Sequence, residues 1–230
     1  MDFEYYYNNV PTEGPSRNNL IYTSLISRDK KTFCQWYYND TVYHKDQNQV
    51  VNPNLMEEKW LREVNYITQM RNAYPDLVPV IKNIDLDAKK LYLEIDGPDF
   101  WQRTMDIKGT YVDVLPDWQD QMLNIFKAHK ELGLWKFSLH PSSYFIVDGK
   151  LKSINYFFCH RNTEEGFSLQ DVESHIYKTR QELLKVVMAK MGIAWDQKLP
   201  LHKIQRLALE SFRVNYPDSF IDRAIDLLDV

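Results

Sequence analysis

Three residues in the middle of the chain carry side-chain oxygen atoms that could contact a phosphate or a metal ion: Ser138, Ser143 and Asn155. Magnesium takes hard oxygen ligands, usually one or two carboxylates together with phosphate oxygens. A general base must accept a proton near neutral pH, which a carboxylate can do and a serine hydroxyl cannot. Because none of the three residues carries a carboxylate, the sequence predicts weak metal binding and poor proton transfer at these positions.

A helix, a loop and a hairpin are expected to position these three residues. Apolar residues at helical spacing predict a helix over 117–132, which Gly133 ends. His129 lies on the apolar face of that helix, so we expect a core histidine rather than a catalytic one. Two strand-forming runs within 144–156, joined by Asp148-Gly149, predict a hairpin. The serines therefore fall on the loop, and the asparagine falls at the end of the second strand.

This order of elements resembles the catalytic centre of the protein kinase-like superfamily, in which a helix end leads into H-R-D-L-x-P-x-N, a hairpin and D-F-G. Lys136-Phe137-Ser138 stands at the position of H-R-D, and Asn155-Tyr156-Phe157 stands at that of D-F-G. The resemblance places Ser138 at the catalytic base, Ser143 at the metal-binding asparagine and Asn155 at the magnesium-binding aspartate. The residue pattern of the loop is more similar to that of aminoglycoside phosphotransferases and related small bacterial or viral kinases than to that of eukaryotic signalling kinases.

The first half of the chain contains the runs that a kinase-like small lobe would need, an antiparallel meander and one helix. Lys45 ends the third run and matches the kinase lysine, while Glu63 on the helix matches the glutamate that pairs with it. The alternative is that Lys45 is exposed at a strand end and Glu63 lies on a helix surface. The resemblance also implies a hinge at Glu94 and Asp96, whose backbone groups would hold an adenine edge. The expected strands cover 20–27, 32–38, 41–44, 78–84 and 90–95, and the expected helix covers 55–70.

The turn over 27–31 stands where a kinase has its glycine-rich loop, and it contains no glycine. Close approach of its backbone to phosphate is therefore disfavoured. Arg28, Lys30 and Lys31 could meet an anion through their side chains, although charged turns usually reflect solvation alone. ATP thus remains a candidate cofactor, with magnesium bound weakly or not at all.

The sequence predicts an α+β protein with a two-lobed, kinase-like fold. Residues 1–19 are expected to form an irregular lead-in, 20–97 a small antiparallel lobe with one helix, and 98–230 a larger, mainly helical lobe that contains the catalytic-loop-like hairpin 138–157. The alternative is that a similar helix, loop and hairpin occur in an unrelated α+β protein. The other segments expected in the larger lobe are helices over 99–105, 168–191, 201–214 and 217–228 and an extended patch over 110–115.

The composition is that of a globular protein, with 44% hydrophobic and 26% charged residues and a net charge of −4. That charge gives no support for a basic nucleic-acid-binding face, and it does not exclude a local basic patch. No run reads as a signal peptide or is long enough to cross a membrane. Cys34 and Cys159 are expected to be reduced thiols. We therefore expect a cytoplasmic protein without a nucleic-acid or membrane partner.

The degenerate motif favours a catalytically inactive kinase-like protein, or pseudokinase, that acts by docking a protein partner, with or without a nucleotide. An alternative is an active ATP-dependent phosphotransferase with non-standard metal ligands. Another is a scaffold or assembly protein with no nucleotide site, which would use aromatic residues such as Tyr5, Tyr6, Tyr7 and Trp195 for contacts.

Overall fold

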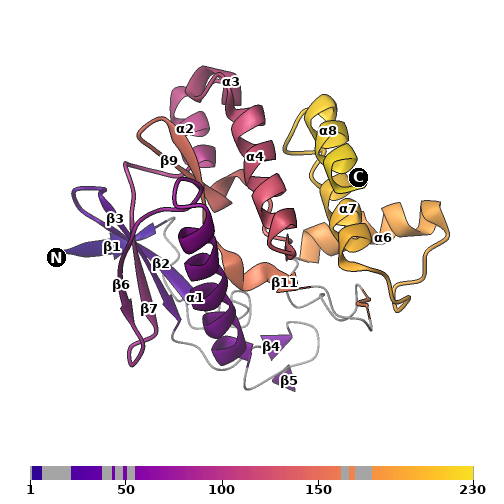
Figure 1. Ribbon diagram of the computed structural model, residues 1–230, viewed down its shortest axis with the longest axis horizontal. Coiled ribbons are helices and arrows are strands. Elements are labelled where there is room, and N and C mark those ends of the chain that lie inside the picture. The colour runs from indigo at the N-terminus through magenta and orange to yellow at the C-terminus, as the bar shows by residue number, and fades with distance from the viewer. Residues whose placement is uncertain are drawn as a thin grey trace. The chain divides into compact units, whose positions relative to one another are not determined.

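The computed structural model describes residues 2–6, 22–37, 43–44, 49–50, 55–161, 166–168 and 178–229. Within these ranges the chain is a mixed α and β protein with a five-stranded antiparallel sheet and seven α-helices (Figure 1). The predicted α+β class is therefore confirmed. Two compact units share the chain: a first unit of Met1–Asp99 and Phe145–Phe157, and a second unit of Phe100–Tyr144 and Phe158–Val230.

The sheet of the first unit has the strand order β1-β2-β3-β7-β6, and all neighbours are antiparallel. Its middle strand, β3, pairs Phe33 with Leu93 and Gln35 with Leu91 of β7. The strands are β1 (Phe3–Tyr5), β2 (Tyr22–Ser27), β3 (Thr32–Tyr37), β6 (Ile81–Asp85) and β7 (Lys90–Glu94).

The glycine-free turn between β2 and β3 is closed by side chains. The Ser27 hydroxyl donates to Asp29 over 2.5 Å and accepts the backbone N–H groups of Lys31 and Thr32 at 3.2 and 2.9 Å. Lys30 takes the left-handed backbone conformation with φ of 56°. A serine and an aspartate thus form this turn without glycine.

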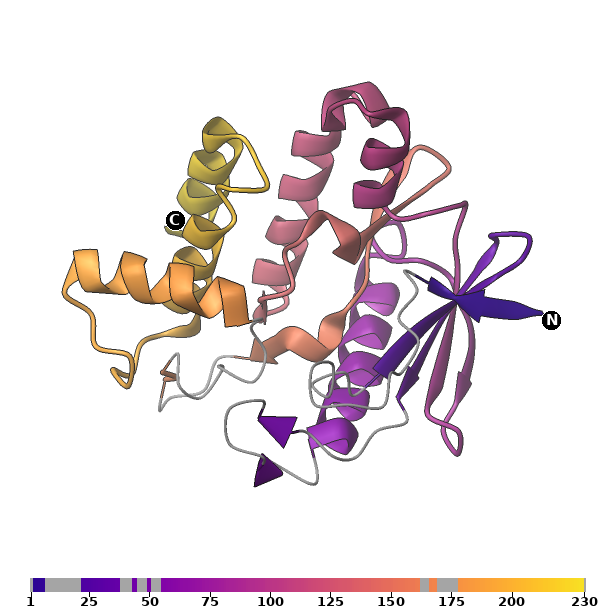
Figure 2. The ribbon, with the colours of Figure 1, turned by 180° about the vertical axis from the view of Figure 1, so that it is seen from behind.

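One face of the sheet is covered by helix α1 (Leu55–Ala73), which lies along the strands in both views (Figures 1 and 2). Alternation along β3 places Phe33, Gln35 and Tyr37 on this face. The Tyr37 ring contacts the Trp60 ring of α1 at 5.4 Å. Trp60, Ile67 and Met70 are all buried, because their spacing follows the helical period.

The hairpin β9 (Tyr144–Val147) and β10 (Lys150–Ser153) agrees with the sequence prediction. Asp148 and Gly149 have φ of 51° and 71°, as a two-residue hairpin turn requires. β10 ends earlier than expected, because Asn155 takes a left-handed conformation with φ of 66° and a 3-10 turn, η3 (Tyr156–Phe158), follows. The hairpin is tied to the segment before β6 by the N–H of Ser153, which donates to the Leu77 carbonyl at 2.8 Å.

The second unit is mainly helical and has an aromatic core. The Trp118 ring packs on Tyr216 at 5.7 Å and on Phe220 at 4.8 Å. Strands β8 (Leu134–Lys136) and β11 (Cys159–Arg161) pair antiparallel, and η2 (Pro141–Ser143) precedes β9. The helices are α2 (Phe100–Ile107), α3 (Tyr111–Val114), α4 (Trp118–Glu131), α6 (Lys178–Met191), α7 (Leu201–Ser211) and α8 (Asp218–Asp229).

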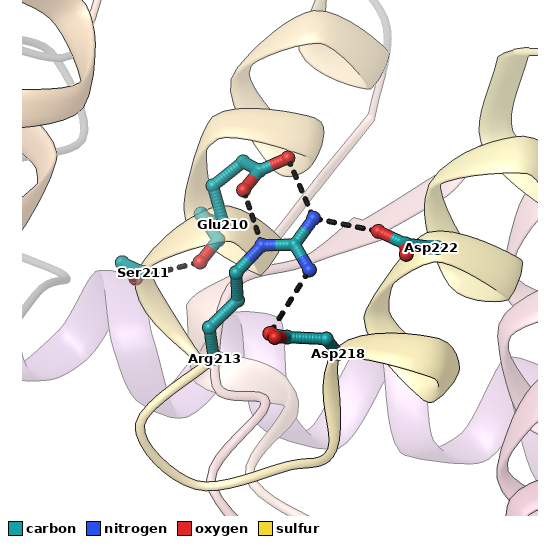
Figure 3. A network of polar contacts seen from close by, with 6 residues as sticks. Glu210, Ser211, Arg213, Asp218 and Asp222 are labelled. Atoms are coloured by element: carbon teal, nitrogen blue, oxygen red, sulfur yellow. Dashed lines mark hydrogen bonds and ion pairs between the residues drawn. The ribbon is translucent and has the colours of Figure 1, made fainter.

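Arg213 connects α7 to α8 through three carboxylates (Figure 3). Its Nε and Nη2 donate to both oxygens of Glu210 at 2.7 and 3.2 Å. Nη1 donates to Asp218 at 3.2 Å, and Nη2 also donates to Asp222 at 2.7 Å. These carboxylates raise the pKa of the guanidinium. The paired hydrogen bonds to Glu210, together with those to Asp218 and Asp222, form a fork that fixes the short turn between the two helices.

Several elements differ from the sequence prediction. Phe3–Tyr5, within the segment expected to be irregular, forms β1 at the edge of the sheet. The third expected strand is only β4 (Tyr43–His44), which pairs with β5 (Gln49–Val50) rather than with β3. The expected extended patch over 110–115 is wrong, because Thr110 and Asp113 form a capping box that starts α3. The start of the helix expected over 168–191 falls partly outside the described residues.

Both cysteines, Cys34 and Cys159, are free and buried. Burial raises the pKa of the Cys34 thiol to about 12, so this thiol is not a nucleophile at neutral pH. In the part of the chain that the structure describes, no helix combines the length and the apolar character needed to cross a membrane.

Candidate functional site

Glu63 of α1 is fully buried, and its carboxylate is held by two donors of the first unit. Its Oε2 accepts the backbone N–H of Phe157 at 2.8 Å and makes a longer contact of 3.5 Å with the Tyr37 hydroxyl. A buried carboxylate is tolerated only with such donors. The alternative that Glu63 lies on a helix surface is therefore wrong. The bond joins α1 to the segment predicted to stand at D-F-G.

Asn155, the first residue of that segment, is bonded to the middle of the sheet. Gln35 Nε2 donates to Asn155 Oδ1 at 2.6 Å, and both side chains are buried. The left-handed backbone of Asn155 suits asparagine, which adopts this region more readily than most residues. The pair is neutral, and the Asn155 oxygen that could have faced a cation accepts an amide hydrogen.

Gln35, Tyr37, Glu63, Asn155 and Phe157 form one group, which we name the buried polar cluster. It gathers side chains and one backbone N–H from β3, α1 and the segment after β10, all within the first unit. Among the residues of the cluster, Glu63 carries the only formal charge. Its Oε2 accepts hydrogen bonds from the protein, as buried polar atoms usually do.

Lys45, expected to pair with Glu63, lies outside the described residues. The cluster contains Gln35, a residue that the sequence prediction missed. Gln35 reaches the cluster from β3, the strand that lies next to β7 in the sheet. A single glutamine within an alternating strand gives no indication that it belongs to a polar cluster. Only the position of β3 in the folded antiparallel sheet identifies it as a member of the cluster.

Ser138 and Ser143 come together in the second unit. Their hydroxyl oxygens are 2.5 Å apart, and Ser143 is buried. The loop between them is fixed by the Tyr216 hydroxyl, which donates to the Leu139 carbonyl at 2.6 Å. Gln205 Nε2 donates to the Lys136 carbonyl at 2.8 Å. The two hydroxyl groups thus bind each other within a rigid loop.

Lys136, at the first position of the degenerate H-R-D, is a buried cation. Its Nζ donates to the Ser138 carbonyl and lies 5.2 Å from the centre of the Tyr144 ring. His129 of α4 is buried as well, which confirms the predicted core histidine. Burial, followed by the nearby Lys136 charge, lowers the pKa of His129 to about 3, so this histidine is neutral at physiological pH.

Two backbone N–H groups of the segment predicted as a hinge donate to carbonyls of the first unit. The N–H of Glu94 donates to the Val80 carbonyl at 2.8 Å, and that of Ile95 donates to the Lys31 carbonyl at 3.1 Å. The Asp96 carboxylate pairs with the Lys31 ammonium at the surface. These bonds extend the sheet ladder. The Glu94 carbonyl and the Asp96 N–H, the two groups expected to hold an adenine edge, stay a prediction.

Among the described residues, no group of three or more His, Cys, Asp and Glu side chains is placed to hold a metal ion. Glu63 supplies the one carboxylate of the cluster, and its Oε2 accepts the N–H of Phe157. Hard cations are usually held by at least one available carboxylate. The residues present therefore fit a magnesium ion poorly.

No protein-family model matches the chain, and no curated protein matches its sequence. A crystal structure of monomeric WbdD superposes with a TM-score of 0.48 at 10% identity, covering 90% of this chain and 48% of that one. A structure of the bifunctional kinase-methyltransferase WbdD gives 0.47 at 10% identity, covering 98% and 51%. The chain spans about half the length of these proteins, and at such scores the likeness carries no argument.

Proposed function

We propose that this chain is a kinase-like protein that does not transfer phosphate and that acts as a binding or regulatory module for a protein partner. The observation that carries the proposal is the buried Gln35–Asn155 pair, with its 2.6 Å amide-to-amide hydrogen bond. At the position of Asn155, a phosphotransferase of the resembled superfamily presents a carboxylate to magnesium. Here that position holds a neutral group whose oxygen already accepts a hydrogen bond.

The loss of charge explains why little phosphoryl transfer is expected. This reaction depends on metal and positioned charge more than on covalent chemistry. Removing a general base costs on the order of 10²- to 10⁴-fold in rate, and a bound metal supplies several kcal/mol of transition-state stabilisation. The hydroxyls of Ser138 and Ser143, 2.5 Å apart, supply neither a base nor a charge for metal.

The cluster keeps a structural role that does not need a nucleotide. Glu63 ties α1 to the N–H of Phe157, and Gln35 ties β3 to Asn155. Bonded to each other, these groups fix the helix, the sheet and the hairpin as one rigid unit, which suits a surface that docks a partner.

Thermal unfolding with ATP, with and without magnesium, tests this function, because a ligand that binds only the folded state raises the midpoint. For the wild-type chain we expect no magnesium-dependent rise. The matched variant Asn155→Asp places a carboxylate at the magnesium position of the resembled superfamily and should gain one. A magnesium-dependent rise in wild type that Asn155→Ala removes would refute the proposal. A metal-independent rise would identify a module that keeps the nucleotide.

A further inference from the structure

An aromatic site lies on the same unit, apart from the buried polar cluster. The Tyr6 ring meets the Phe33 ring edge-on at 5.7 Å and the Phe145 ring at 6.5 Å. The two phenylalanine rings lie 5.0 Å from each other. All three side chains are buried, and they come from the end of the N-terminal segment, β3 and β9.

The Tyr6 hydroxyl is recognised by a buried acidic residue 93 positions away. It donates to Asp99 Oδ2 at 2.9 Å and accepts the Asp99 backbone N–H, also at 2.9 Å. Asp99 is fully buried and forms an isolated bridge with Phe145. One oxygen atom therefore has to donate and accept at once, which a hydroxyl can do and an ammonium or a carbonyl cannot.

We propose that Phe33, Phe145 and Asp99 form a binding site for a phenol group, and that Tyr6 is the occupant supplied by the chain itself. The rings of the two phenylalanines contact the flat apolar ring of the phenol, and Asp99 forms hydrogen bonds with its hydroxyl group. This inference does not depend on the proposed function, because it uses no kinase position and no nucleotide.

The attachment of Tyr6 is short enough for the occupant to be exchanged. Its strand, β1, has three residues and lies at the edge of the sheet, where it pairs with β2. The backbone N–H of Arg28 donates to the Asp2 carbonyl at 3.1 Å, and their side chains form an exposed ion pair. Exposed pairs and short edge strands open at low cost. A phenol from another source can then compete for the site.

The test uses the full chain with Tyr6→Ala, which removes the occupant and leaves the three residues of the site. Phenol should raise the thermal midpoint of this variant and bind about tenfold more tightly than toluene, because one hydrogen-bonded group separates the two probes. In the matched control Tyr6→Phe the ring still fills the site, so neither probe should shift the midpoint. Equal shifts by phenol and toluene in Tyr6→Ala, or no shift by either, would overturn the proposal.

Two further arms complete the design. N-acetyl-tyrosinamide stabilising Tyr6→Ala as well as phenol does would show that the site accepts a tyrosine side chain of a polypeptide. Stabilisation by phenol alone would restrict the site to small free phenols. If Tyr6→Ala does not remain folded, its refolding yield from urea replaces the midpoint. A yield that phenol raises more than toluene supports the site, and an unchanged yield refutes it.

Discussion

Replacing His129 with glutamine should reduce the loss of unfolding free energy that occurs as the pH falls below neutral. Burial lowers the pKa of His129 from 6.5 to about 3. Below about pH 6.5 the unfolded chain binds a proton that the folded chain does not bind until about pH 3. The stability contributed by the neutral histidine is therefore complete above about pH 6.5 and is lost as the pH falls towards 3.

The expected size of this effect follows from the shift in pKa. Each pH unit within the window costs about 1.4 kcal/mol. Lowering the pH from about 7 to about 5 should therefore remove about 2 kcal/mol of unfolding free energy from the wild type through this residue alone. Glutamine does not titrate, so His129→Gln should lose that much less over the same interval, whatever its stability at neutral pH.

Urea denaturation of both proteins at the two pH values measures the difference directly. The comparison should be repeated at high salt, because desolvation of a buried group is not screened, whereas exposed ion pairs are. The same loss of free energy in wild type and in His129→Gln would refute the reasoning. So would a difference that disappears in salt.

Three further predictions concern charge. Burial lowers the pKa of Lys59 to about 7, because the charged ammonium is costly to bury. Lys59→Met should therefore stabilise the fold by a few kcal/mol below about pH 7. Urea denaturation should show this gain in unfolding free energy shrinking as the pH rises towards the ordinary lysine pKa. Asn155→Asp should cost about 2 kcal/mol at neutral pH, and adding Gln35→Lys should recover most of it; additive effects in the double-mutant cycle would contradict the contact between residues 35 and 155. Arg213→Ala should cost about 1 kcal/mol, less at high salt, and Arg213→Lys should lose most of the same energy because lysine cannot form the fork with Glu210, so a lysine variant as stable as wild type in thermal unfolding would argue against the fork.

The hairpin and the long helices could be predicted from the sequence because their signals are local. Strand-forming runs on either side of Asp148-Gly149 predicted β9, and helical spacing before Gly133 predicted α4. The meeting of Ser138 with Ser143 also follows from a short loop. In each case the residues that carry the signal lie within a few positions of one another.

The remaining features depend on contacts between distant segments. Gln35 forms its hydrogen bond with Asn155, 120 positions later, and Tyr6 forms its hydrogen bond with Asp99. Short runs such as β4 can pair with several partners, and tertiary packing decides which. A polar residue in a strand gives no indication of the partner that it will meet.

Magnesium-dependent ATP turnover by the purified chain tests the central claim, that a kinase-like frame is used here without phosphoryl transfer. We predict a rate equal to that of buffer, unchanged in Asn155→Ala, because neither Asn155 nor the Ser138–Ser143 pair supplies charge to a metal or a base. A rate that scales with protein concentration, requires magnesium and is lost in Asn155→Ala would contradict the claim.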